Sequence, residues 1–497
     1  MTNSTIAAIS TPPGIGGIAI IRLSGPDAFS IADKVWKGKR LSEASSHTAH
    51  LGIITDTDGE TLDQAIATVY AEGKSFTGEK TVEFAIHGSK WIQRRVVERL
   101  IEEGASTASP GEFTQRAFLN GRLDLAQAEA VADMIAASSK AAQRLAVSQM
   151  RGTFSRRLNE LRDSMIEIAS LLELELDFSE EDVEFADRTR LLHMTCTTRD
   201  EIRLLADSFK AGRALKEGVA VVIAGKPNAG KSTLLNCLLQ DEKAIVSDIA
   251  GTTRDIIEDT IEINGILFRF IDTAGLRDSD DRIEQIGVNR ARQAIEKADI
   301  ILHLIDTTEP ATDSDSEMTG LPTSIPVITL LTKSDLIKSN PSTSAASPES
   351  GNEISATDRV SRTTSTPQES VLTASAAEQH GLTLSATQLT DTINDPISIS
   401  AKTGEGIPEL IDLMTKIAES GRDTTSDLIV TNARHYESLT RAAEALDRVE
   451  QSLTSGLPAD LTAQDLREAI HHLGAITGAI TPADLLHSIF SHFCIGK

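Results

Sequence analysis

The sequence predicts a multidomain fold: an α+β module at the N-terminus, an all-α helical domain, and an α/β phosphate-binding module inserted into that helical domain. Three observations predict it. Residues 1–119 mix short β-branched runs with glycine and proline turns, apolar residues recur at helical spacing after residue 123 and again after residue 423, and a strand-like run at 219–224 leads directly into a glycine-rich loop. Because 497 residues are too many for one core, we expect segments at 1–119, 120–216, 217–422 and 423–497.

The elements outside the inserted module follow from spacing and from helix-start signals. A strand at 18–23 follows the G-I-G-G turn at 14–17, and a helix is expected at 91–103. The next helix should bury one face formed by Leu125, Ala128, Ala132 and Ile135, and another long helix should cover 158–176. A last helix should start at residues 481–484, T-P-A-D, which offer an N-cap threonine and a proline at the first helical position.

The glycine-rich loop reads G-K-P-N-A-G-K-S over residues 225–232 and would open a helix. Backbone N–H groups in such a loop bind nucleotide phosphates, while Lys231 would reach the terminal phosphates and the Ser232 hydroxyl would coordinate Mg²⁺. Asn228 inside the loop has two readings. It is either a residue that tolerates left-handed backbone or an amide that ligates a monovalent cation beside the phosphates.

Later segments appear in the order that a GTPase requires. Residues 250–255, A-G-T-T-R-D, form a switch-like loop whose Thr253 could complete the Mg²⁺ shell. A strand at 265–271 ends in D-T-A-G, where Asp272 would hold Mg²⁺ through water and the Gly275 amide would sense the γ-phosphate. These segments predict a Ras-like α/β P-loop G domain.

A guanine-reading loop follows the strand at 327–331. It reads T-K-S-D over residues 332–335, and Asp335 can pair with the N1 and N2 donors that adenine lacks, so GTP is favoured over ATP. A turn at 400–402 follows the run at 396–399 and would close over the base. The expected nucleotide contacts are Asn228, Ala229, Gly230, Lys231, Ser232, Thr233, Ser247, Asp248, Ile249, Ala250, Gly251, Thr252, Thr253, Asp272, Thr273, Ala274, Gly275, Thr332, Lys333, Asp335, Ser400, Ala401 and Lys402.

The hydrolytic residue differs from that of Ras-like enzymes. The position after the D-x-x-G glycine, a water-orienting glutamine in those enzymes, is Leu276 here, and leucine cannot orient water. Either hydrolysis is negligible or another group acts, and Glu284 is the nearest candidate. Its alternative reading is a solvated residue at a helix start. Lys231, Asn228 and Glu284 are therefore the candidate catalytic residues.

Composition restricts compartment and partners. A net charge of −25 and a pI near 4.9 argue against broad nonspecific binding of nucleic acid, so any RNA contact must be local. Three widely spaced cysteines, Cys196, Cys237 and Cys494, predict a reducing compartment, the cytosol, without a disulfide framework. No signal peptide or membrane-length apolar run is expected. The Ser- and Thr-rich segment at 338–395 is predicted to be disordered, although residues 383–392 could fold locally.

Four stretches resemble one family. They are the terminal C-I-G-K at 494–497, the run P-G-E-F-T-Q-R-A-F-L-N-G-R-L-D-L-A-Q-A-E-A at 110–130, S-F-T-G-E at 75–79, and A-G-T-T-R-D. In these the chain resembles MnmE, also called TrmE, a family of bacterial tRNA-modification GTPases. The resemblance covers the whole chain except the segment at 338–395.

The resemblance implies a homodimer through the N-terminal domains and a 5-formyltetrahydrofolate-type site there. It also implies a heterotetramer with an FAD-dependent protein of the MnmG type, which together install an aminomethyl or carboxymethylaminomethyl group at C5 of the wobble uridine of tRNA. The implied folate contacts are Arg22, Glu83, Arg122 and Lys497, and the family more typically has lysine in place of Arg122. The implied K⁺ ligands for G-domain dimerisation are Asn228, Ser247, Ile249 and Thr252, with Glu284 orienting water through a bridging water.

Three points stay open. Thr332 stands where most family members carry asparagine, and its hydroxyl offers one fewer donor for tying the base loop to the phosphate loop. Cys494 is either a nucleophile near the folate site or an ordinary thiol. The alternative function is a GTP-dependent binding switch in ribosome or RNA assembly that performs no modification chemistry.

Overall fold

A computed structural model of the chain describes residues 4–177, 188–226, 228–241, 258–272, 298–308, 325–338, 395–419, 428–455, 457, 459–480, 483–491, 493 and 496. The chain divides into two compact units. The first comprises residues 1–217 and 423–497, and the second comprises residues 218–422.

The N-terminal part of the first unit is a seven-stranded sheet with strand order β3-β4-β5-β6-β2-β1-β7. Its neighbouring strands are antiparallel except for the parallel pair β1 and β7. The elements are β1 (Ile6–Ile9), β2 (Gly16–Ser24), α1 (Ala28–Val35), β3 (Trp36–Lys37), η1 (Leu41–Glu43), β4 (Thr48–Thr55), β5 (Thr61–Tyr70), β6 (Thr81–Gly88), α2 (Lys90–Glu102) and β7 (Ser106–Thr107).

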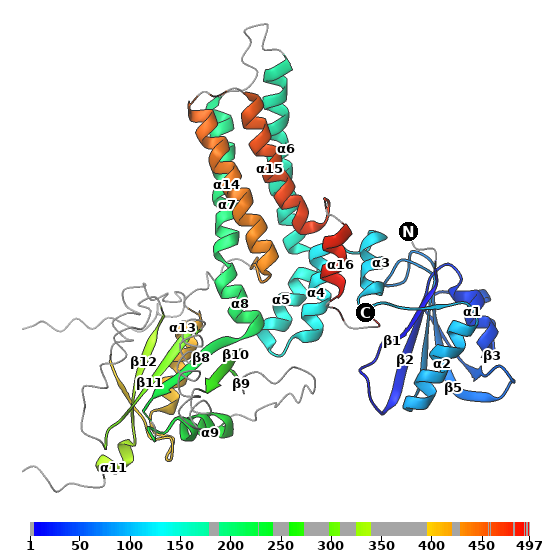
Figure 1. Cartoon of the computed structure of the whole chain (residues 1–497), viewed down its shortest axis with the longest axis horizontal. Coiled ribbons are helices and arrows are strands. Elements are labelled where there is room, and N and C mark those ends of the chain that lie inside the picture. The colour runs from blue at the N-terminus through cyan, green and yellow to red at the C-terminus, as the bar shows by residue number, and fades with distance from the viewer. Residues whose placement is uncertain are drawn as a thin grey trace, which may run out of the picture. The chain divides into compact units, whose positions relative to one another are not determined.

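Helices α1 and α2 pack on one face of this sheet (Figure 1). The alternation of side chains along each strand sends Ile21, Phe84 and Ala67 to that face, where they are buried. The opposite face carries Leu51, Ile66 and Ile18, whose side chains are 67%, 45% and 69% exposed. Leu51 and Ile66 are cross-strand partners, so the sheet presents neighbouring apolar side chains on this face.

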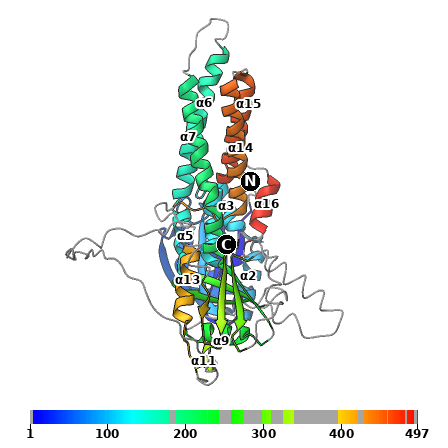
Figure 2. The same ribbon diagram turned by 90° about the vertical axis from the view of Figure 1, so that its left-hand side faces the viewer.

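The helical part of the first unit is built around four long helices that lie side by side (Figure 2). They are α6 (Thr153–Asp177), α7 (Arg188–Asp207), α14 (Ala433–Ser455) and α15 (Ala459–Thr477). Shorter helices precede and follow them: α3 (Glu112–Leu119), α4 (Leu125–Ala136), α5 (Lys140–Met150), α8 (Phe209–Glu217) and α16 (Ala483–Ser491). A shared core of leucine, isoleucine and alanine side chains joins residues from both ends of the sequence.

The chain segments on either side of the inserted module touch each other within the first unit. The Val430 amide donates a hydrogen bond to the Ser208 hydroxyl over 3.0 Å. A methyl group added at Gly212 in α8 would lie 2.0 Å from the Val430 carbonyl oxygen, so only glycine permits this approach. The outgoing helix and the returning segment are therefore fastened together.

The predicted buried face of α4 is partly wrong. Leu125 and Ala128 are buried, but Ile135 is 50% exposed in the last turn of the helix. The buried strip instead includes Glu129, whose carboxylate is compensated by Arg434 and His435 of α14. Apolar periodicity alone does not identify such a position.

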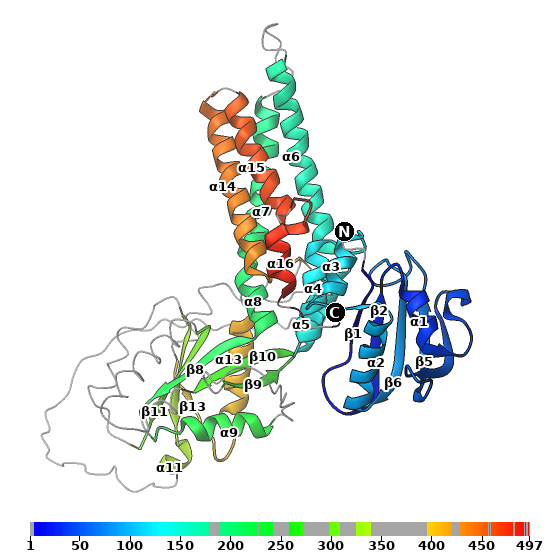
Figure 3. The same ribbon diagram turned by 45° about the vertical axis from the view of Figure 1, so that its right-hand side comes forward.

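The second unit contains a six-stranded sheet with order β13-β12-β11-β8-β10-β9 (Figure 3). All neighbours are parallel except the hairpin of β9 and β10. Its elements are β8 (Val219–Gly225), α9 (Lys231–Asp241), β9 (Glu258–Ile263), β10 (Ile266–Asp272), β11 (Ile300–Asp306), β12 (Val327–Thr332), α11 (Ser334–Lys338), β13 (Ile397–Ser398) and α13 (Ile407–Glu419). The predicted fold class is confirmed: an α+β part, a helical part, and an α/β module between the two halves of the helical part.

Across the described ranges, every helix is too short or too polar to cross a membrane. Among the described cysteines, Cys196 and Cys237 form no disulfide. The segment predicted to be disordered lies, for residues 339–394, outside the described residues.

Candidate functional site

The phosphate loop occupies the carboxyl end of β8, where a parallel sheet commonly binds ligands. Asn228 and Gly230 have positive φ angles of 65° and 94°, and α9 begins at Lys231. A methyl group on Gly225 would lie 2.6 Å from the Leu304 carbonyl oxygen, so this position requires glycine. The left-handed backbone predicted for Asn228 is therefore observed, and the N-terminus of α9 provides free N–H groups for an anion.

The Lys231 ammonium group lies over this loop. It donates hydrogen bonds to the carbonyl oxygens of Gly225 and Lys226 over 2.9 and 3.0 Å. Ser232 and Thr233 follow in the first turn of α9 with exposed side chains. A cationic group, a helix N-terminus and a nearby hydroxyl form a donor set that fits nucleotide phosphates and Mg²⁺.

Thr332 connects the base-reading loop to the phosphate loop. Its buried hydroxyl lies 2.9 Å from the carbonyl oxygen of Ala229 and 3.2 Å from that of Ile305. The Thr332 carbonyl in turn accepts a hydrogen bond from the Thr307 hydroxyl over 2.6 Å. Threonine has a shorter side chain than asparagine and one fewer donor. Thr332 nevertheless makes a hydrogen bond to the phosphate loop.

Asp335 is held by the turn at residues 400–402. The Ser400 hydroxyl donates to the Asp335 carboxylate over 2.8 Å, and Ser400 is fully buried. The Asp335 carboxylate keeps acceptor sites on both oxygens for a ligand with two adjacent donors, such as guanine. Ala401 is half-buried and Lys402 is exposed in the same turn.

Lys333 has a left-handed backbone with φ 62° and forms an ion pair with Asp306 over 2.5 Å. Burial alone would raise the pKa of Asp306, but the hydrogen bond from Lys333 leaves that pKa below its usual value. The carboxylate therefore stays ionised and orients the Lys333 side chain.

Many predicted nucleotide-site residues lie outside the described residues. Asp272 ends β10, and only its backbone is described. Of the expected K⁺ ligands the structure describes Asn228, and of the two direct Mg²⁺ ligands it describes Ser232. The predicted residues that fall outside are Ser247, Asp248, Ile249, Ala250, Gly251, Thr252, Thr253, Thr273, Ala274, Gly275, Glu284, Cys494 and Lys497.

A second polar site lies on the N-terminal sheet. Arg22 of β2 and Glu83 of β6 are cross-strand partners and form an ion pair over 2.8 Å. The Arg22 guanidinium lies over the rings of Phe76 and Phe113, 5.6 and 5.5 Å from their centroids. The Tyr70 hydroxyl donates to Glu83 over 3.4 Å, and burial together with this carboxylate raises the pKa of Tyr70.

The side chains of Arg22, Tyr70, Phe76 and Glu83 line a cavity of about 140 Å³. Lys74, Thr77 and Thr81 complete its walls. Of the other predicted folate contacts, Arg122 is exposed and lies close to Gly78, which follows Thr77 of the cavity wall. Its Cγ atom is 3.2 Å from the position that a methyl group on Gly78 would occupy. Near the C-terminus, the Gly496 carbonyl accepts a hydrogen bond from Ser10, just after β1, over 3.1 Å.

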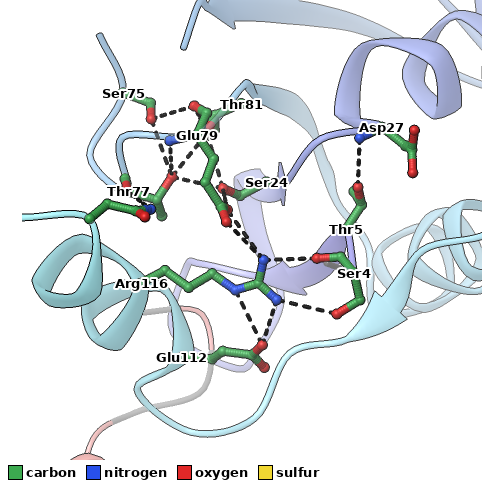
Figure 4. A network of polar contacts seen from close by, with 11 residues as sticks. Ser4, Thr5, Ser24, Asp27, Ser75, Thr77, Glu79, Thr81, Glu112 and Arg116 are labelled. Atoms are coloured by element: carbon green, nitrogen blue, oxygen red, sulfur yellow. Dashed lines mark hydrogen bonds and ion pairs between the residues drawn. The ribbon is translucent and has the colours of Figure 1, made fainter. Parts of the chain in front are cut away.

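Sequence reasoning missed a buried network beside this cavity (Figure 4). Arg116 of α3 donates to Glu79, to Glu112 and to the Ser4 carbonyl over 3.0, 2.7 and 2.8 Å. Ser24 donates to Glu79 over 2.8 Å. Glu79 belongs to the S-F-T-G-E stretch and Arg116 to the P-G-E-F-T-Q-R stretch, and the opposite charges of these two residues were the available signal. The network fastens α3 to the edge of the cavity.

Two family models together match nearly the whole chain. The model described as "GTP-binding protein TrmE N-terminus" matches residues 5–122, and the "MnmE helical domain" model matches residues 125–494. The sequence predicted both likenesses from its motifs.

Curated relatives match over the full length. The tRNA modification GTPase MnmE of Parabacteroides distasonis is 45% identical, with 99% of this chain and 100% of the relative covered. The proteins of the same name from Porphyromonas gingivalis and Cytophaga hutchinsonii are 46% and 45% identical, each with 99% of this chain and 98% of the relative covered. Among solved structures, Era of Aquifex aeolicus is 27% identical over 46% of this chain and 66% of that chain, with a TM-score of 0.25, and adds nothing to the assignment. The chain therefore belongs to the MnmE family of tRNA modification GTPases.

Proposed function

We propose that this chain hydrolyses GTP within a cytoplasmic complex that modifies C5 of the wobble uridine of tRNA, adding an aminomethyl or carboxymethylaminomethyl group. GTP hydrolysis is supported by one observation above all. Thr332 links the base-reading loop, which contains Asp335, to the phosphate loop at Ala229. Family membership supports the tRNA part and disfavours a binding switch without modification chemistry. The partner would be an FAD-dependent protein of the MnmG type in a heterotetramer.

Asn228 is proposed to ligate K⁺ beside the phosphates, together with Ser247, Ile249 and Thr252, when two G domains pair. Its exposed amide on a left-handed backbone at the mouth of the loop supports this role. Bound K⁺ would supply positive charge opposite the γ-phosphoryl group, in place of an arginine finger. Lys231 would bind the terminal phosphates, and Ser232 and Thr253 would hold Mg²⁺.

The test compares GTP hydrolysis in K⁺ and in Na⁺ at equal ionic strength. We expect much faster turnover in K⁺, and we expect Asn228→Ala to lose that advantage while it still binds GDP. Asn264→Ala is the matched control, because Asn264 is also left-handed, with φ 52°, but lies in the β9–β10 turn. Equal rates in both salts for the unmodified chain would remove the cation from the mechanism.

Glu284 is proposed to orient the attacking water through a bridging water, since Leu276 cannot. A Glu284→Ala protein should bind GTP normally and hydrolyse it at least about a hundredfold more slowly, as for loss of a general base or water-orienting group. Unchanged single-turnover rates would exclude Glu284 from this role.

The cavity beside Arg22 and Glu83 is proposed to bind a 5-formyltetrahydrofolate-type ligand, with Arg122 and Lys497 contributing charge and Cys494 acting as a nucleophile. A guanidinium, a carboxylate and a phenol can pair with the polar edge of a pterin ring. The cavity of about 140 Å³ is smaller than the roughly 300 Å³ at the lower end of ligand sites. A second copy on the exposed apolar sheet face would enlarge it, which supports a homodimer through the N-terminal domains.

Two measurements test this site. Glu83→Gln should weaken binding of 5-formyltetrahydrofolate in calorimetry without changing GTP hydrolysis, and Leu51→Glu should shift the sedimentation of the chain toward a monomer. Glu43→Gln is the control, since Glu43 is an exposed carboxylate in a pair with Arg40 on the same domain. For the tRNA chemistry, mass spectrometry of nucleosides from cells lacking the gene should show unmodified wobble uridines.

A further inference from the structure

One segment of the helical domain has an unusual charge pattern. Between Asp133 and Glu160 the sequence contains no acidic residue. With 73 acidic residues among 497, a stretch of this length would on average hold about four. The same stretch contains five basic residues, Lys140, Arg144, Arg151, Arg156 and Arg157. It is a local basic segment in a strongly acidic chain.

The structure places four of these cations on the surface. Lys140, Arg144 and Arg151 are separated by four and seven residues, so they lie on one face of α5 and its C-cap. Arg156 follows in the first turn of α6, and all four are exposed. The other face of α5 is buried through Ala142, Ala146 and Gln149. We call Lys140, Arg144, Arg151 and Arg156 the basic ridge.

Three ridge arginines also differ from arginines elsewhere in the helical domain by their lack of partners. Arg144, Arg151 and Arg156 form no ion pair with any residue that the structure describes. Several other arginines on the long helices are paired with carboxylates: Arg199 and Arg203 with Asp447, Arg448 with Asp465 and Glu468, and Arg467 with Glu173. The charge of these three ridge residues is therefore available to an external anion.

We propose that the basic ridge binds the phosphate backbone of tRNA. The inference rests on the proposed function, in which the chain acts on tRNA. A net charge of −25 repels RNA. At physiological ionic strength, salt screens this repulsion beyond about 8 Å. Close contact therefore depends on local charge, and guanidinium groups bind phosphate oxygens in pairs of hydrogen bonds.

The ridge is suited to the backbone rather than to bases. The one aromatic residue between positions 140 and 156, Phe154, is buried against His435. Without an exposed ring on which a base could stack, contacts at the ridge would position the tRNA without reading its sequence. Recognition of the wobble base would occur elsewhere.

The test measures binding of a labelled tRNA transcript to the full chain, alone and assembled with its flavoprotein partner, over a series of salt concentrations. The triple variant Arg144→Ser, Arg151→Ser, Arg156→Ser should bind at least about tenfold more weakly at 0.1 M salt. The slope of log K against log salt should become shallower by about 2 to 3, since each phosphate contact contributes roughly 0.7 to 0.9. The matching triple change to lysine should retain most of the binding.

The control variant is Lys37→Ser, Lys39→Ser, Lys90→Ser, which removes the same charge from exposed positions of the N-terminal part. It should bind within about twofold of the unmodified chain, and GTP hydrolysis should be unchanged in both triple variants. Equal weakening by both variants would overturn the inference, since net charge alone would then explain it. Normal tRNA binding combined with failed assembly would also overturn it and identify the ridge as a protein-docking surface. If the unmodified chain binds no tRNA in either state, the proposed function fails as well.

Discussion

The hydroxyl of Thr332 donates a hydrogen bond to the main-chain carbonyl of Ala229, joining the base-reading loop to the phosphate loop across 103 residues of sequence. Both groups are buried, so no water replaces the bond readily. A displacement of either loop therefore strains the other. Binding of the base and binding of the phosphates should be energetically coupled through this contact.

Thr332→Val should weaken GDP binding about threefold to tenfold, because it keeps the shape of the side chain but leaves the Ala229 carbonyl without its donor. Thr332→Asn should bind at least as tightly as the original chain. Calorimetry with GDP measures both, and Thr329→Val on the same strand is the control. Wild-type affinity in Thr332→Val would show that the contact is not needed.

Ser400→Ala should also reduce GDP affinity, by about threefold to tenfold, because Asp335 loses the hydrogen bond that holds its carboxylate. Ser398→Ala, an exposed change on β13, should have no effect. The same titrations with ADP check specificity. Unchanged GDP affinity in Ser400→Ala would show that this hydrogen bond is not needed to hold Asp335.

Glu129 predicts a specific acid sensitivity of the helical domain. Burial alone would raise the pKa of Glu129, but the charges and hydrogen bonds of His435 and Arg434 lower it to about 2 from 4.5. Because the folded pKa lies below the unfolded value, this carboxylate stabilises the fold above pH 4.5 and loses that effect as the pH falls toward 2. The contribution at neutral pH is on the order of 3 kcal/mol.

Glu129→Gln should therefore lower the free energy of unfolding at pH 7 by about that amount, and its difference from the original chain should shrink toward pH 3. Urea unfolding followed by circular dichroism measures the change. Glu437→Gln removes an exposed carboxylate from α14 and should change stability by less than about 0.5 kcal/mol. A difference that does not vary with pH would exclude ionisation of Glu129 as its cause.

Gly212→Ala should destabilise the first unit by about 1 to 3 kcal/mol, because the new methyl group would lie 2.0 Å from the Val430 carbonyl oxygen. Gly17→Ala is the control, since an added methyl there meets no atom within 4 Å. Thermal unfolding compares the two. If both variants melt alike, the close approach of α8 to Val430 is not rigid.

Elements with strong local signals could be predicted from the sequence. The strand expected at 219–224 is β8 (Val219–Gly225), and the helix expected at 91–103 is α2 (Lys90–Glu102). Their signals are an apolar run before a glycine-rich loop and helical spacing, both of which are local. The predicted fold class also held, because each part of the chain has its own periodicity.

Long-range polar contacts could not be predicted in this way. Glu129 is buried because Arg434 and His435 meet it from more than 300 residues away, and no local pattern indicates that pairing. The Arg116 network likewise joins three separated stretches. Family motifs marked these residues as distinctive without revealing that they are buried partners. The catalytic assignments for Asn228 and Glu284 stay predictions.

The contact of Gly212 with Val430 has a consequence for modularity. The segment before residue 217 and the segment after residue 423 contact each other within the first unit, through Ser208, Gly212 and Val430. The first unit therefore holds its two chain segments together without needing the second unit. Residues 218–422 therefore form a domain inserted at one position of the first unit. Excising it and bridging the gap with a short flexible linker should yield a self-standing scaffold, and a different switchable module could be grafted at the same position.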